Sequence, residues 1–243
     1  MNAINDFSKI AEISEAFTSI GGRFLLPAEI IKTKLQTIKA FVFDWDGVFN
    51  SGFKSEALPS LFSEVDAAGL NLMRYSYYGV NKTVPLCSFI TGEENPAALY
   101  LTKREGIHFV FMKVVNKIDA INHLCKRHNL TPAQVACVFD DMNDLSMAKV
   151  CGLRFMINKS CNPAFQGYAV NNNMCDYITG NEQPNNPLRE ICELIIALTG
   201  NYEQCILSRT NFDDNYKKYL EQKKSVKPNL VKAANVGFLE EPA

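Results

Sequence analysis

The 243-residue sequence has little of several features that assign a protein to a class at once. Its 25 basic and 26 acidic residues nearly cancel, so its charge favours neither nucleic acid nor an anionic membrane as a partner. No apolar run is long enough to span a bilayer, and the first residues lack the basic-then-apolar pattern of a signal peptide. We therefore expect a cytoplasmic protein with neither a membrane nor a nucleic-acid partner.

Cysteine pairs of the kind that bind zinc or form redox centres are also missing. None of the eight cysteines forms a Cys-x-x-Cys pair, and several, such as Cys87 and Cys137, lie in apolar runs typical of core strands. This pattern predicts reduced, buried thiols rather than a disulfide framework. The three histidines (His108, His123 and His128) fall outside the motifs described below, and we expect them to have surface or packing roles.

The sequence is organised instead around residues 41–49, which read Phe-Val-Phe-Asp-Trp-Asp-Gly-Val-Phe. Asp44 and Asp46 are two residues apart at the end of an apolar run, so on a strand their side chains point to the same side. Gly47 allows a sharp turn directly afterwards. Crowded carboxylates repel each other, and a bound cation relieves that repulsion. A strand that merely ends in a polar loop would explain a lone Asp-x-Asp equally well.

Three later apolar runs also end close to a reactive group. They are the run that ends at Thr91-Gly92, the run 107–111 followed by Lys117, and the run 135–139 followed by Asp140-Asp141-Met142-Asn143-Asp144. Apolar strands that alternate with amphipathic helices predict a parallel sheet covered by helices on both faces. Ligands bind beyond the carboxyl ends of the strands in such sheets, so we expect all four motifs at one edge.

The expected elements divide the chain into three parts. We predict a helical extension over 1–38, a main α/β domain over 39–200, and a polar extension over 201–243. The expected strands are 39–44, 84–90, 107–111, 135–139 and 153–157, and the expected helices are 66–78, 95–105, 116–129, 143–151 and 187–199.

Both extensions show weaker patterns. An apolar stripe from Ile4 to Ile20 predicts one helix, and Pro27 a second that ends near Leu35. In the C-terminal extension we expect a solvated helix over 211–222, whereas the last fifteen residues have little periodicity and are expected to be mobile.

The segment between Val48 and Val65 is too short for a separate cap domain. About twenty residues remain there, and Gly52 with the polar turn Lys54-Ser55-Glu56 predicts a β-hairpin flap. A ligand site at this edge of the sheet therefore lacks a lid of its own, and another element has to exclude water from it.

In this order, the four motifs resemble those of the haloacid-dehalogenase-like hydrolases, whose commonest activity is metal-dependent hydrolysis of phosphate esters. The resemblance covers about residues 39 to 200 and is strongest to the capless 3-deoxy-manno-octulosonate 8-phosphate phosphatases. It rests further on Phe62-x-x-x-Asp66-x-x-Gly69 and on Leu188-Arg189-Glu190. It implies a Rossmann-like three-layer sandwich with a central parallel sheet, and a homotetramer in which a neighbouring copy covers the site.

The resemblance also implies roles for single residues. Asp44 is the nucleophile that forms an aspartyl-phosphate, and Asp46 is the general acid and base. Mg²⁺ is held by the Asp44 carboxylate, the Asp46 carbonyl and the Asp140 carboxylate. Asp144 or Asp141 holds a metal-bound water or orients Lys117. Thr91, Gly92 and Lys117 bind the phosphoryl group, and Arg189 of one copy reaches the substrate in another. Apart from the resemblance, Asp144 can equally cap the helix that starts near Asn143, and both roles can coexist.

Four departures from the family pattern bear on the substrate. Glu93 replaces a usual arginine and Phe139 a usual glycine, while Asn50-Ser51-Gly52 and the run 183–187 replace two further family segments. We expect a magnesium-dependent phosphomonoesterase that acts on a phosphorylated sugar acid of the octulosonate 8-phosphate or nonulosonate 9-phosphate type. The alternatives are a phosphatase for another small metabolite, a phosphotransferase or mutase, and a non-catalytic relative that binds or assembles.

Overall fold

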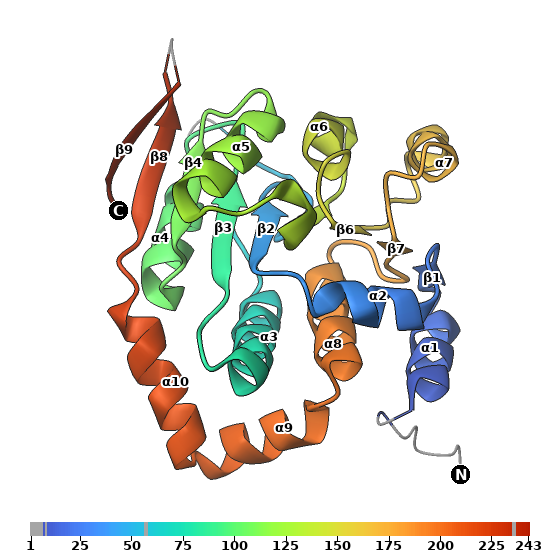
Figure 1. Cartoon of the computed structure of the whole chain (residues 1–243). Helices are drawn as coiled ribbons and strands as arrows, with labels where there is room; N and C mark the ends of the chain where they lie inside the picture. The colour runs from blue at the N-terminus through green and yellow to red at the C-terminus, as the bar shows by residue number, and fades with distance from the viewer. Residues whose placement is uncertain (1–6, 8, 56–57, 235–236) are drawn as a thin grey trace.

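The computed structural model describes residues 7, 9–55, 58–234 and 237–243. Strands of these residues form one sheet in the order β1-β7-β6-β5-β2-β3-β4-β8-β9 (Figure 1). The strands from β7 to β8 are parallel to one another, whereas β1 and β9 pair antiparallel at the two edges. The strands are β1 (Arg23–Phe24), β2 (Ala40–Asp44), β3 (Leu86–Ile90), β4 (Phe109–Met112), β5 (Val135–Phe139), β6 (Leu153–Met156), β7 (Tyr177–Ile178), β8 (Asn229–Ala233) and β9 (Phe238–Pro242).

Helices cover both faces of this sheet. They are α1 (Ile10–Ser19), α2 (Ala28–Leu35), α3 (Glu64–Asn81), α4 (Pro96–Glu105), α5 (Lys117–His128), α6 (Leu145–Ala148), α7 (Pro163–Asn171), α8 (Pro187–Thr199), α9 (Tyr202–Asn211) and α10 (Asp214–Ser225). The 3₁₀ turns are η1 (Pro132–Gln134) and η2 (Met142–Asp144). No helix of the described residues combines the length and the apolar character needed to cross a bilayer.

The central strand β2 shows how the layers form. All five of its residues are buried. Phe41 and Phe43 pack into one apolar cluster with α3 and α8, and Ala40 and Val42 pack into a second cluster with α5 and α6. Because successive side chains of a strand point to opposite faces, one unbroken apolar run supplies both clusters. The predicted three-layer α/β sandwich is confirmed.

The main domain follows the prediction closely, and the extensions contain the predicted helices, as α1, α2 and α10, but not the predicted mobile C-terminus. Each of the five predicted strands is present, and α8 has the predicted bounds 187–199. The expectation of mobile residues at the C-terminus is wrong for those that the structure describes, because β8 pairs with β4 and β9 with β8. Backbone hydrogen bonds to an existing edge stabilise such strands without a side-chain pattern. Ile4 of the predicted N-terminal stripe lies outside the described residues.

The predicted flap is a loop. The described residues between Gly47 and Ser63 contain no paired strands beyond one isolated bridge of Asp46 with Asn50. This loop is anchored from below, because the buried Trp45 side chain donates its Nε1–H to the Ser60 carbonyl over 3.2 Å. Glu56 of the predicted turn lies outside the described residues. Neither a helix nor a further strand occupies the described part of this segment, which agrees with the absence of a cap.

The division into three domains stays a prediction, although both extensions contribute to the same sheet. β1 comes from the N-terminal part, and β8 and β9 come from the C-terminal part. All eight cysteines are free thiols, and seven of them are buried. His108 has a packing role, since its Nδ1 accepts a hydrogen bond of 3.2 Å from the Cys87 amide.

This histidine predicts a pH dependence of stability. Burial, with smaller effects of Arg74 and His128, lowers the pKa of His108 from 6.5 to about 3. Between pH 6.5 and 3 the unfolded chain protonates this imidazole while the folded protein keeps it neutral. The unfolding free energy is therefore unaffected by this group above pH 6.5 and decreases as the pH falls from 6.5 towards 3. In urea denaturation between pH 7 and 4.5, we expect wild type to lose roughly 2 kcal/mol more unfolding free energy than His108→Asn. Parallel pH profiles of the two proteins would contradict this assignment.

Candidate active site

The four motifs meet at the carboxyl edge of the sheet, around a cavity of about 410 Å³. Asp44 ends β2, Asp140 directly follows β5, and Lys117 begins α5 after β4. The predicted site residues that line the cavity are Asp44, Asp46, Gly92, Lys117, Asp140 and Asp144. Parallel strands bring their carboxyl ends to one edge, so segments separated by up to a hundred residues contribute to one hollow.

The turn after β2 places its two acids by burying the residue between them. Trp45 is fully buried and stacks on Phe49, with ring centroids 4.8 Å apart. Gly47 follows with φ +89°, and a Cβ atom at this position would lie 1.9 Å from Asp140 Oδ2. A residue without a side chain is therefore required twice over here, for the backbone conformation and for the close approach of the Asp140 carboxylate.

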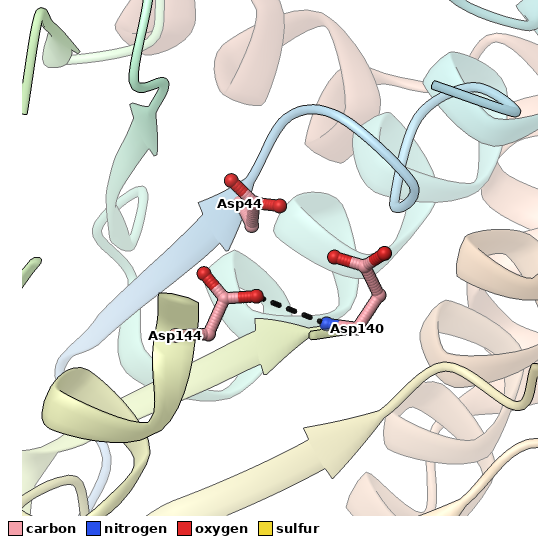
Figure 2. A group of neighbouring side chains, drawn as sticks. All are labelled: Asp44, Asp140 and Asp144. Atoms are coloured by element: carbon pink, nitrogen blue, oxygen red, sulfur yellow. Dashed lines mark hydrogen bonds between the residues drawn. The ribbon is translucent and has the colours of Figure 1, made fainter. Parts of the chain in front are cut away.

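Three buried carboxylates come together beside this turn. Asp44, Asp140 and Asp144 each offer an oxygen atom, and these atoms lie within 4.8 Å of one another. Figure 2 shows the three side chains facing a common space, with Asp144 accepting a hydrogen bond of 3.2 Å from the Asp140 amide. Burial and then the Asp144 charge raise the pKa of Asp44 well above its usual value and that of Asp140 to about 6.

This donor set suits a hard divalent cation. Mg²⁺ binds carboxylate oxygens and water, and it would stabilise the charged forms that burial and mutual repulsion disfavour. Soft or imidazole-binding metals fit less well, because the described cluster contains neither a thiolate nor an imidazole.

Lys117 lies between two of the three acids. Its Nζ forms ion pairs with Asp44 and with Asp144, and all three side chains are buried. Burial acts to lower the pKa of Lys117, but the two carboxylates outweigh it and raise that pKa. Asp144 thus orients Lys117, one of the roles left open for it, while Asp141 caps η2 by accepting the Met142 amide.

Asp46 belongs to a more exposed network on the loop side. Its carboxylate accepts a hydrogen bond from Ser60 Oγ and another of 3.2 Å from Lys54 Nζ. Asn95, at the start of α4, donates to Ser60 Oγ over 2.7 Å. The loop that replaces the predicted flap therefore holds Asp46 at the cavity wall, next to Asp44.

Sequence reasoning missed Lys159. It lines the cavity and forms an ion pair with Asp140. Burial acts to lower the pKa of Lys159, and the Asp140 charge outweighs it and raises that pKa. Lys159 follows β6 at the same edge that supplies Asp44 and Asp140. The position of a basic residue just after a predicted strand was thus a signal that could have identified it.

Two predicted residues are placed less directly. Gly92 lines the cavity, but the Thr91 side chain is buried beneath it, where its Oγ1 accepts the Glu93 amide over 3.3 Å. Arg189 lies elsewhere, on α8, where its guanidinium pairs with Glu193 and its side chain lines a different hollow. A role for Arg189 in the site of a second copy stays a prediction.

Comparisons with known proteins bear on the fold that carries this site. Residues 80–181 match the family model described as haloacid dehalogenase-like hydrolase. The fold is that of the haloacid dehalogenase-like hydrolases. The resemblance inferred from the motifs is confirmed at this level.

Several solved structures of haloacid dehalogenase-like proteins are similar to the chain. One is 3-deoxy-D-manno-octulosonate 8-phosphate phosphatase from Moraxella catarrhalis, in complex with magnesium, phosphate and KDO: TM-score 0.61, 24% identity, 74% of this chain and 98% of that one. The cobalt-bound deoxy-D-mannose-octulosonate 8-phosphate phosphatase from Haemophilus influenzae has a TM-score of 0.57 and 21% sequence identity, and the match covers 77% of this chain and 99% of that one. A putative hydrolase of the haloacid dehalogenase superfamily from Legionella pneumophila has a TM-score of 0.61 and 24% identity, and the match covers 75% of this chain and 95% of that one. At these identities the likeness establishes the fold.

Gly47 provides a test of the cation site. In Gly47→Ala the new methyl group would displace the Asp140 carboxylate, so we expect the rise in melting temperature on adding Mg²⁺ to disappear. Gly52→Ala is the matched control, because Gly52 also has positive φ, +76°, but open space around it. Both variants should lose about 1 kcal/mol from the strained backbone, and only the control should keep the Mg²⁺ response. Equal Mg²⁺ affinities, measured by calorimetry, would contradict the placement of Asp140 at the cation.

Proposed function

We propose that the protein is a magnesium-dependent phosphomonoesterase that works through a phosphorylated Asp44. One observation carries this proposal: Asp44, Asp140 and Asp144 converge with Lys117 in one cavity at the carboxyl edge of a haloacid dehalogenase-like sheet. The two ion pairs hold Lys117 against the carboxylate that would attack, and the open side of the cavity admits a small ester.

The carboxylates of Asp44 and Asp140 and the backbone carbonyl of Asp46 would hold Mg²⁺, with Asp144 close by. When bound, the cation neutralises charge on the acids and on the phosphoryl oxygens. Lys117 supplies further positive charge to the transferring group, and the Gly92 amide, at the cavity wall, can donate to a phosphoryl oxygen.

In the first step a carboxylate oxygen of Asp44 attacks phosphorus, and the bond from phosphorus to the ester oxygen breaks. Asp46, in its protonated form, gives its proton to the departing alkoxide, which leaves as an alcohol. The position of Asp46 on the loop side of the cavity, held by Ser60 and Lys54, suits contact with the leaving group rather than with the phosphoryl oxygens.

In the second step water attacks the phosphorus of the aspartyl-phosphate. Asp46, now a carboxylate, takes a proton from that water, the bond between Asp44 and phosphorus breaks, and inorganic phosphate leaves. Asp46 thus returns to its protonated form and Asp44 to its carboxylate, so the cycle closes without another reactant.

Two classes of substrate have support. A phosphorylated sugar acid is supported by the likeness to the Moraxella catarrhalis phosphatase, whose structure contains KDO and phosphate. A different small metabolite is supported by Glu93, which lines the cavity. Cover by a neighbouring copy in a homotetramer, with Arg189 reaching across, is part of the same resemblance and is proposed with it.

The non-catalytic alternative loses its main support in the structure. Phe139 is fully buried in the apolar cluster beneath the site and does not line the cavity. Glu93 leaves the three buried acids and Lys117 in place. Neither departure removes a group that the proposed reaction uses.

Asp44→Asn tests the nucleophile. We expect hydrolysis of p-nitrophenyl phosphate with Mg²⁺ to fall by at least about a thousandfold, because an amide does not attack phosphorus, while the circular dichroism spectrum stays that of wild type. Lys103→Gln, an exposed change on α4 away from the cavity, serves as the control. The proposal fails if wild type releases no phosphate from any ester, or if Asp44→Asn remains active.

Asp46→Asn separates the two steps. p-Nitrophenolate leaves without a proton, so the first step should proceed, whereas the second needs the base and should slow by about 10²- to 10⁴-fold. Intact-mass spectrometry after acid quenching should then show a phosphoryl adduct that accumulates in Asp46→Asn and is absent in the Asp44→Asn, Asp46→Asn double variant. An adduct that persists in the double variant would place the phosphoryl group on another residue.

A further inference from the structure

The charges that line the cavity are unbalanced. The described lining contains six carboxylates and only three ammonium groups: Asp44, Asp46, Glu93, Asp140, Asp141 and Asp144 against Lys54, Lys117 and Lys159. A phosphate dianion and one divalent cation cancel each other, so the excess of negative charge remains when both are bound. Such a field disfavours a second anionic group on the substrate.

Each lysine of the lining is already engaged by an acid. Lys117 pairs with Asp44 and Asp144, Lys159 with Asp140, and Lys54 with Asp46. A substrate carboxylate would have to take one of these cations from its partner. Because Lys117 and Lys159 hold the acids of the proposed reaction, that exchange would disturb the reacting groups themselves.

Glu93 is different from the other acids of the cavity. It lies at the exposed end of the Thr91-Gly92 turn, and no described residue gives its carboxylate a hydrogen bond or an ion pair. The neighbouring Glu94 binds both nearby lysines, with its Oε1 at 3.0 Å from Lys113 Nζ and at 3.3 Å from Lys232 Nζ. Glu93 therefore presents a free acceptor to whatever occupies the cavity next to the phosphate.

A second hollow, of about 700 Å³, adjoins the first cavity. It shares Val114 and Val115 with that cavity, and its other side is lined by Ala233 and Ala234 at the end of β8 and by Gly237 and Phe238 at the start of β9. Among the described residues, the polar side chains that line this groove are two amides, Asn116 and Asn122, and one of each charge, Lys113 and Asp119. Since Glu94 forms an ion pair with Lys113, the described lining offers a carboxylate no unpaired cation either.

We infer that Glu93 selects phosphate esters whose other end carries hydroxyl or amino groups and no carboxylate, with that end lying towards the groove between α5 and the β8–β9 hairpin. The inference rests on the proposed function and decides between the two substrate classes left open there. Glu93 accepts hydrogen bonds from hydroxyl or ammonium groups of a substrate and repels a carboxylate, so a sugar acid is the disfavoured class.

A matched pair of compounds isolates this charge. Glucitol 6-phosphate and 6-phosphogluconate are open six-carbon chains that differ at one end, a hydroxymethyl group in the first and a carboxylate in the second. Each is used as a competitor of p-nitrophenyl phosphate hydrolysis, which yields a binding constant whether or not it is itself hydrolysed. At low ionic strength we expect 6-phosphogluconate to bind wild type about tenfold more weakly, and this ratio to shrink with added salt.

Substitutions of Glu93 test whether its charge causes this difference in binding. Glu93→Gln should reduce the ratio several-fold by strengthening 6-phosphogluconate binding, and Glu93→Arg should invert it. Glu203→Gln, which removes the same charge from the exposed surface of α9, should keep the wild-type ratio. An unchanged ratio in Glu93→Gln, or tighter binding of 6-phosphogluconate to wild type, overturns the inference while leaving the phosphatase proposal intact. Failure of wild type to release phosphate from any ester overturns the proposed function instead.

Discussion

Repulsion among three buried carboxylates is the constraint on which the active-site region depends. Asp44, Asp140 and Asp144 are buried side chains with carboxylate oxygens close to one another, an arrangement that burial and like charge both oppose. Lys117 offsets part of this opposition, and Lys159 another part. The negative charge that the two lysines leave uncompensated attracts a divalent cation. The same repulsion that destabilises the cluster of acids therefore favours binding of the cation.

The surrounding fold serves to hold these acids where they would not gather by themselves. β2 is buried on both faces, so its register is fixed by two apolar clusters and Asp44 has no freedom to slip towards solvent. Trp45, the residue after Asp44, is fully buried in the core, and Gly47 allows the Asp140 carboxylate to come close. The buried core thus lies directly beneath Asp44 and Asp140, whereas Asp46 belongs to a more exposed network.

The extent to which the sequence predicted this structure follows from the range of the forces involved. Asp44, Lys117 and Asp140 could be placed from the sequence because strand burial and the parallel topology together dictate a shared edge. Lys159 was missed because it stands outside every motif and its role comes only from an ion pair across the sheet. The β8–β9 hairpin was missed because backbone hydrogen bonds to a neighbouring strand stabilise these strands. Such bonds leave no periodic pattern of side chains in the sequence. The predicted flap proved to be a loop because Trp45 and Asn95 tie Ser60 down, contacts between segments far apart in the chain.

The antiparallel strands at the two margins of the sheet have a consequence for solubility. An apolar strand exposed at the edge of a sheet presents unpaired backbone amide and carbonyl groups, which can pair with a strand of another molecule and cause aggregation. Here one margin ends in β1, only two residues long, and the other ends in β9, whose sequence Phe-Leu-Glu-Glu-Pro combines two acids with a proline that lacks an amide hydrogen. A strand arriving from another molecule at β9 would meet the exposed Glu241 and a missing hydrogen-bond donor at Pro242, both of which oppose further growth of the sheet at this edge.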